Sequence, residues 1–146
     1  METVEERIYR RRWLTMLTLV SGLIVVIIDN TILNVALPSI SQQLGASQAQ
    51  LTGAILSYAV VFGSLQFTAG VLGDRWGRKR IFMIGLVLFG LASLAASLSQ
   101  SPNQLVGFRA LMAIGAAMIT PQTLSILTNV FPPAERGRAI AIWAGC

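Results

Sequence analysis

The sequence predicts an all-α protein, a polytopic transmembrane helix bundle. Of its 146 residues 54% are hydrophobic and 12% are charged, and this charged share is about half that of a soluble domain. The apolar residues gather in runs of about 20, long enough for a helix to cross roughly 30 Å of hydrocarbon. We therefore expect helices over residues 13–37, 49–72, 81–98 and 105–131, and a fifth from 139 that stops with the chain at 146.

The connections support these helices in order. The first run is too long for a signal peptide and has no clear cleavage site of small residues, so we expect it to remain as a helix. Uncharged segments, 39–48 and 99–104, lead into the second and fourth runs, whereas a basic, glycine-rich loop joins the second to the third. Small residues four apart, such as Ala113 and Ala117, predict close contact between helices in lipid.

The basic residues indicate an orientation. Four precede the first run, four lie between the second and third, and two follow the fourth. By the positive-inside rule the N-terminus and the loops around Asp74 and Glu135 are cytoplasmic, in a multi-pass protein of the inner or plasma membrane. Contacts with lipid headgroups explain the net charge of +5, so we predict a lipid bilayer and no nucleic acid among its partners.

Little in the sequence points to catalysis or metal binding. The single cysteine, Cys146, and the absence of histidine exclude an internal disulfide and a Cys/His metal cluster. We find no nucleophile elbow, phosphate-binding loop or zinc motif. We therefore predict no catalytic residue, no metal and no cofactor, in a protein that is not an enzyme.

Two charged residues lie inside apolar runs, Asp29 in the first and Arg109 in the fourth. A charge at this depth costs at least about 2.5–3.5 kcal/mol, so it normally faces a bundle interior or a wet cavity and has a partner. At about 1.5 Å per residue, Asp29 lies about 13 Å and Arg109 about 6 Å from the outer helix ends, which permits an ion pair between them. Alternatively, Arg109 extends to the headgroups and serves only as an anchor.

Asp29 is too deep and too short to reach the headgroups. Burial favours the neutral form of a carboxyl group and a nearby guanidinium favours its charged form, so such a group can exchange a proton near neutral pH. We therefore interpret Asp29 and Arg109 as a proton-coupling pair. The polar neighbours Asn30, Thr31 and Asn34 indicate a helix that lines water.

The segment 70–80, GVLGDRWGRKR, predicts a tight loop between antiparallel helices. Asp74 suits the N-terminal end of a helix, where free N–H groups favour negative charge. Basic residues of the loop can bind lipid phosphates or pair with acids such as Glu135. These basic residues are Arg75, Arg78 and Lys79. Glycines allow the sharp turn, and they are Gly70, Gly73 and Gly77.

This loop resembles the signature G-x-L-x-D-R-x-G-R-K of the major facilitator superfamily of secondary transporters. Every defining position matches, namely Gly70, Leu72, Asp74, Arg75, Gly77, Arg78 and Lys79. Residues 28–40, IDNTILNVALPSI, resemble the helix-one motif of the drug/proton antiporters with fourteen helices. Residues 105–117, LVGFRALMAIGAA, resemble the helix-four arginine motif, but Met112 and Ala113 replace a usual glutamine and glycine. The resemblance covers nearly the whole chain from about Trp13 onward.

The resemblance implies two six-helix halves, built from inverted three-helix repeats, that rock about a central site. Helices one and four would line this site. The loop would be a latch for the outward-facing arrangement, with Asp74 facing a helix end of the other half and Arg78 paired with an acid near Glu135. The chain would then be an N-terminal fragment: a cytoplasmic segment, 1–12, and a partial six-helix domain, 13–146, whose partner is the missing C-terminal half.

We therefore expect a proton-coupled multidrug antiporter, driven by the proton gradient, with a small lipophilic substrate. A proton-coupled metabolite or sugar carrier is an alternative within the same superfamily, because the loop signature is widely shared, but the helix-one motif favours the drug branch. From a different class, the chain could be a stand-alone four-helix membrane protein that binds or scaffolds a partner. Such a protein should insert stably by itself.

Overall fold

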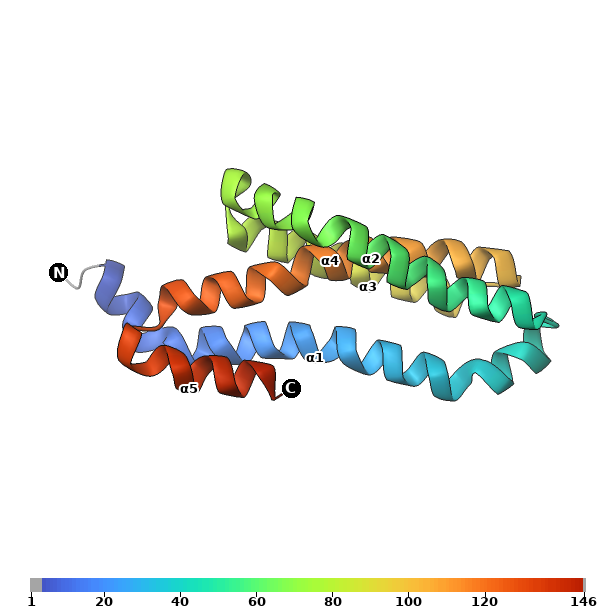
Figure 1. Ribbon diagram of the computed structural model, residues 1–146, viewed down its shortest axis with the longest axis horizontal. Helices are drawn as coiled ribbons and strands as arrows, with labels where there is room; N and C mark the ends of the chain where they lie inside the picture. Colours follow the sequence, from blue (N-terminus) through green and yellow to red (C-terminus); the bar gives the residue numbers. More distant parts are fainter. Residues whose placement is uncertain (1–3, 146) are drawn as a thin grey trace.

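The computed structural model describes the backbone of residues 4–145 and the side chains from Arg11 onward, and this part of the chain forms five helices (Figure 1). They are α1 (Val4–Leu44), α2 (Gln48–Trp76), α3 (Arg78–Ser97), α4 (Pro102–Val130) and α5 (Pro133–Ala144). The first four are long and apolar enough to cross a membrane. The structure thus confirms the all-α, multi-pass fold.

Several helices are longer than the apolar runs predict. α1 begins at Val4 instead of residue 13, because arginine and glutamate are good helix formers and the basic segment simply continues the helix. α5 begins at Pro133 instead of 139, since proline fits the first helical position. Residues 1–3 and 146, at the ends of the predicted N-terminal segment and fifth helix, lie outside the described residues.

Capped turns join the helices at the uncharged end of the bundle. Ser47 accepts a hydrogen bond from the backbone of Gln50, whose side chain accepts one from the Ser47 backbone. This reciprocal capping box fixes the start of α2, and Ser101 caps α4 through the backbone N–H of Gln104. Both turns lie opposite the start of α1, the α2–α3 junction and the α4–α5 turn (Figure 1). We call the end of the bundle that contains the α2–α3 junction and the α4–α5 turn the basic end.

α4 is the central helix of the bundle. It packs on α2 and α3 along much of its length and also contacts α1 and α5. Its residues Ala113 and Ala117 are fully buried, as their spacing predicted. The tightest approach is between Gly85 of α3 and Gly115 of α4, where a Cβ on Gly85 would lie 2.9 Å from the Gly115 carbonyl oxygen. Only glycine allows the two backbones to approach this closely.

α1 packs on α4 through a narrow stripe. Its buried hydrophobic residues are three, four or seven positions apart, which places them on one face of the helix. They are Met16, Leu19, Leu23, Val26 and Leu33. Asn30 falls on the same stripe and Asp29 lies beside it. The helix register therefore turns these two polar side chains toward α4.

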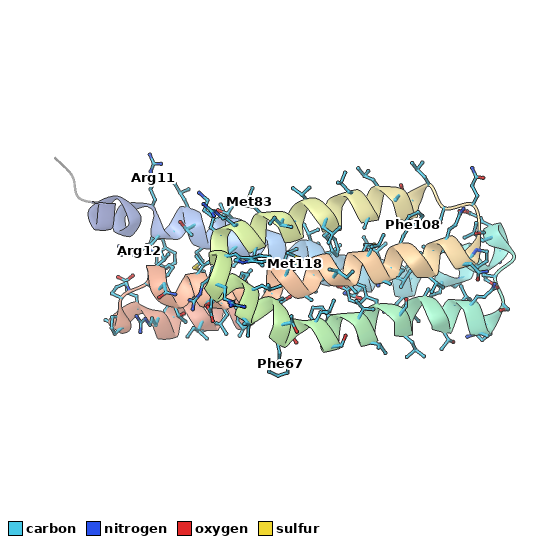
Figure 2. The ribbon with its side chains drawn as sticks, turned by 90° about the horizontal axis from the view of Figure 1, so that it is seen from above. Arg11, Arg12, Phe67, Met83, Phe108 and Met118 are labelled. Carbon is cyan, nitrogen blue, oxygen red and sulfur yellow. The ribbon has the colours of Figure 1, made fainter. Side chains whose placement is uncertain are left out.

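The outer surface of the long helices is apolar. Phe67, which is 88% exposed, projects away from α2 (Figure 2). Exposed leucine, isoleucine and valine side chains occur on all five helices. Lipid tails are as apolar as these side chains, so the surface suits a bilayer. Polar groups buried inside the bundle are thus the informative exceptions.

Candidate functional site

Arg109 is a buried charged residue in the half of α4 that lies near the uncharged end of the bundle. Only 2% of the residue is exposed, although it carries a full positive charge. One terminal nitrogen donates a hydrogen bond to a carboxylate oxygen of Asp29, and the other donates to Asn30 Oδ1 at 3.2 Å. The two lone charges of the apolar runs therefore meet between α1 and α4, and Arg109 is not an anchor in the headgroups.

The two partners of this ion pair differ in exposure. The Arg109 side chain is 3% exposed and the Asp29 side chain is 20% exposed. A buried guanidinium without a partner is strongly destabilising, so Asp29 compensates the charge of Arg109. Asp29, in contrast, is only partly buried, so part of its side chain is accessible from outside the described bundle.

Tyr58 of α2 forms a further wall of this site. The Arg109 guanidinium carbon lies 4.3 Å from the centre of the Tyr58 ring, within the distance of a cation–π contact. The ring stacks on Phe62 at 6.0 Å between centroids. Sequence reasoning missed Tyr58, because an aromatic residue in an apolar run is usually part of the core. Its phenolic hydroxyl, which normally needs a partner when buried, was the available signal.

Among the described residues, Thr31 and Asn34 form their side-chain hydrogen bonds within α1 and not with Arg109. Thr31 donates to the Ile27 carbonyl at 3.1 Å and Asn34 donates to the Asn30 carbonyl at 2.9 Å, so both bonds stay within α1. Both residues are exposed in the described chain. Asn30 thus belongs to the ion-pair site, while the cavity-lining role of Thr31 and Asn34 stays a prediction.

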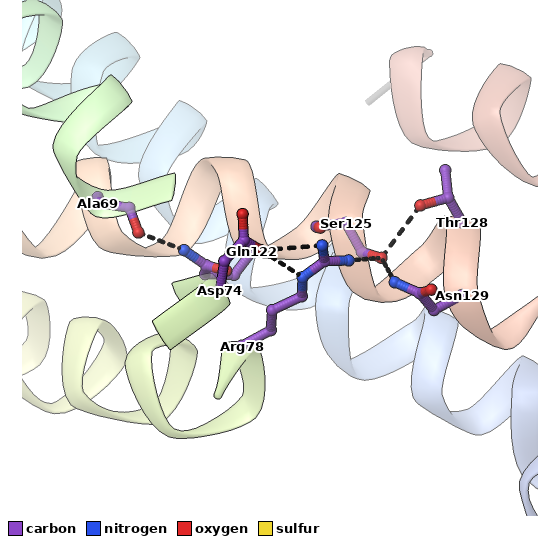
Figure 3. Close-up of polar contacts among 7 residues, drawn as sticks. All are labelled: Ala69, Asp74, Arg78, Gln122, Ser125, Thr128 and Asn129. Atoms are coloured by element: carbon purple, nitrogen blue, oxygen red, sulfur yellow. Dashed lines mark hydrogen bonds and ion pairs between the residues drawn. The ribbon is translucent and has the colours of Figure 1, made fainter. Parts of the chain in front are cut away.

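A second cluster of polar side chains lies at the α2–α3 junction (Figure 3). Gly77 alone separates the two helices, with φ +97°, a backbone conformation that favours glycine. Arg78 donates to Asp74 Oδ1 from Nε at 3.0 Å and from a terminal nitrogen at 2.9 Å. Its other terminal nitrogen donates to the Ser125 carbonyl of α4 at 3.0 Å. Arg78 therefore ties the junction to α4.

The position predicted for Asp74 within this junction is wrong. Asp74 lies in the last turn of α2 and does not cap α3, because α2 continues to Trp76 and leaves no loop before Gly77. Among the other residues of the motif, Arg75 and Lys79 are exposed. Gly70 faces α4, since a Cβ on Gly70 would lie 4.0 Å from Pro121, an ordinary van der Waals distance.

Gln122 is a second tie between α4 and the basic end, visible in Figure 3. Its side-chain nitrogen donates to the Ala69 carbonyl at 2.7 Å, and the residue is 1% exposed. The amide lies where a side chain on Gly73 would be, since a Cβ there would come within 2.1 Å of Gln122 Oε1. A lone glutamine in an apolar run could have been found by the reasoning that found Arg109.

The resemblance implied that Arg78 pairs with an acid near Glu135, but Arg78 pairs with Asp74 and Glu135 has a different partner. Glu135 lies in the first turn of α5, which folds back along α1 (Figure 1), and pairs with Arg12. Arg12 Nε lies 3.0 Å from Glu135 Oε2, and a terminal nitrogen donates to Oε1 at 3.0 Å. This two-pronged ion pair joins α1 to α5 at the basic end.

Sequence comparison shows which known proteins this chain is similar to. A sequence model of the Major Facilitator Superfamily matches residues 19–146. The methyl viologen resistance protein SmvA of Salmonella typhimurium is 45% identical over 135 residues, which cover 92% of this chain and 27% of that protein. The multidrug efflux pump LfrA of Mycolicibacterium smegmatis is 39% identical over 137 residues, with 93% and 27% covered.

The tetracenomycin C resistance and export protein of Streptomyces glaucescens is 37% identical over 135 residues, which cover 92% of this chain and 25% of that protein. The chain thus spans about a quarter of the length of the curated relatives it matches, which is 27% for SmvA and LfrA.

Proposed function

Because the chain belongs to the Major Facilitator Superfamily, we propose that it forms part of a proton-coupled antiporter that exports drugs. Relatives named for methyl viologen resistance and multidrug efflux support export over uptake of a sugar or metabolite. The remaining helices of the transporter would be its main partner, and the basic end would face the cytoplasm. The energy source would be the proton gradient, without a bound cofactor.

The buried ion pair of Asp29 and Arg109 carries this proposal. It joins two helices through side chains that lie 80 residues apart in the sequence. A proton on Asp29 would remove the negative charge, weaken the contact and allow α1 and α4 to rearrange. Loss of the proton would restore the contact. A cationic, lipophilic substrate beside Asp29 would compete with the proton, so the two would be exchanged across the membrane.

The cluster at the α2–α3 junction would serve as the conformational latch. Arg78 contacts both Asp74 and the Ser125 carbonyl, so a movement of Asp74 against the other half of the transporter would reach α4 directly. Gln122 would strengthen this path through its bond to Ala69. The latch would govern the rate of the conformational change, whereas the ion pair would govern its coupling to protons.

Transport by the full-length protein in inverted membrane vesicles tests the proposal. An imposed pH gradient should drive ethidium into the vesicles with the wild-type protein. Asp29→Asn should abolish this transport at an unchanged level of protein in the membrane, because the amide cannot exchange a proton. Ser21→Ala, on α1 at an exposed side chain whose hydrogen bond stays within α1, is the matched control. Transport that survives Asp29→Asn would overturn the proposal.

A further inference from the structure

The Arg109 guanidinium is held from two sides. α1 provides the Asp29 carboxylate and the Asn30 side-chain oxygen, and α2 provides the face of the Tyr58 ring at 4.3 Å. We infer that Tyr58 is a positioning residue that holds the Arg109 guanidinium in place while Asp29 carries a proton. The inference rests on the proposed function, because it assigns a role in the same proton cycle.

The need for such a residue follows from the burial of Arg109. Protonation of Asp29 removes the counter-ion of a guanidinium that is 3% exposed. A buried cation without compensation is strongly unfavourable, so the protonated state needs another source of negative potential. The face of an aromatic ring provides one. In the ion-paired state its attraction for the guanidinium is partly offset by repulsion of the adjacent Asp29 carboxylate, and protonation of Asp29 removes that repulsion. The ring therefore stabilises the protonated state more than the ion-paired state.

The ring, not the hydroxyl, is the active part of Tyr58. The residue is 6% exposed and its ring stacks on Phe62, so its orientation is fixed. Its hydroxyl lies beside the Asn30 side chain, but the geometry there is too poor for a normal hydrogen bond. Phenylalanine should therefore replace Tyr58 without loss, whereas an aliphatic residue should not.

Within the part of the chain that the structure describes, few ionisable groups surround this site. Asp29 of α1 and Tyr58 of α2 face Arg109, and α4 carries no other ionisable residue. The Asp, Glu, Lys and Arg residues of α2, α3 and α5 lie at the basic end, in the last turn of α2 and the first two turns of α3 and α5. A pH dependence that arises at this site therefore reports the protonation of Asp29.

The pH dependence of ethidium binding to the purified full-length transporter tests the inference. Wild-type binding should weaken as the pH falls, because protons compete at Asp29. Tyr58→Leu should move the midpoint to lower pH by roughly 0.4–1.5 units. This range is the usual cation–π energy divided by the free energy that corresponds to one pH unit. Tyr58→Phe should keep the wild-type midpoint. Equal midpoints for Tyr58→Leu and wild type, or equal shifts for the leucine and phenylalanine variants, would overturn the inference.

A trifluorinated phenylalanine at position 58 keeps the test independent of folding. Fluorine weakens the negative face of the ring while preserving its shape, so the midpoint should move to lower pH relative to Tyr58→Phe. An unchanged midpoint would contradict a role for the ring. Asp29→Asn separates the two hypotheses: if this variant retains the wild-type pH dependence, the proposed function itself fails, whatever Tyr58 does.

Discussion

Two carboxylate–guanidinium pairs in this molecule have the same chemistry and opposite settings. Asp29 and Arg109 join helices that are distant in sequence, and their side chains are 20% and 3% exposed. Asp74 and Arg78 are four residues apart, and their side chains are 62% and 34% exposed. The first pair therefore connects α1 directly to α4, whereas the second lies within one turn of the chain at the α2–α3 junction.

The difference indicates how the two pairs contribute. An exposed pair at this spacing contributes about 0.3–0.5 kcal/mol, so Asp74 and Arg78 add little to the stability of the bundle. Their importance lies in the bond from Arg78 to the Ser125 carbonyl, which connects the junction to α4. The buried pair, in contrast, should affect stability and proton coupling together.

The largest effect should come from Arg109→Leu in the full-length protein. Removal of one partner of a buried ion pair leaves the other uncompensated and costs about 3–5 kcal/mol. We expect a marked fall in the thermal unfolding temperature of the purified protein, measured in detergent. The double variant Asp29→Asn with Arg109→Leu should recover much of the loss, because no unpaired charge remains. A single variant as stable as wild type would show that the pair contributes little.

A smaller effect should follow Gly73→Ala, which tests the tie between the basic end and α4. The added methyl group would displace the Gln122 amide from the Ala69 carbonyl, and a buried amide without its partner costs about 1–3 kcal/mol. The same thermal unfolding measurement should therefore show a moderate decrease.

Gly63→Ala is the matched control on the same helix, because a Cβ there meets no atom within 4 Å. If the Gly73 effect arises from the amide, adding Gln122→Ala should cost less in the Gly73→Ala background than in the wild type. Additive effects of the two changes would contradict the contact.

The smallest change in stability should come from Asp74→Ala. The ion pair of Asp74 and Arg78 is exposed, so its loss should cost at most about 1 kcal/mol. We nevertheless expect turnover to slow, because Arg78 loses the acid that orients it toward Ser125. The rate of ethidium transport and the Kd for ethidium should be measured in parallel. A loss of affinity at an unchanged rate would contradict the role of a latch.

The contacts that follow from the energetic cost of burying a charge could be predicted from the sequence. The contacts that depend on how the helices are positioned relative to one another could not. A charge inside an apolar run must find a partner, so Asp29 and Arg109 could be matched without coordinates. Many arginines near the basic end could pair with Glu135, and the choice of Arg12 depends on the extension of α1 and the return of α5 along it. No pattern of composition distinguishes these options.

The close contacts of the core were hidden for a related reason. Glycine is common in membrane helices, so Gly85 and Gly115 carry no signal until the crossing point of α3 and α4 is known. Tyr58 was hidden because its ring resembles any other apolar group. The difference between a core aromatic and one that covers a guanidinium lies in the rotation of α2 relative to α4.

Proton release on substrate binding tests the central claim most directly. Addition of ethidium to the purified full-length transporter in weakly buffered solution, near the pH at which half of the binding is lost, should release protons that a pH indicator detects. Asp29→Asn should abolish this release, while Ser21→Ala should leave it unchanged. Equal proton release from the wild type and the Asp29→Asn variant would contradict proton exchange at the buried ion pair.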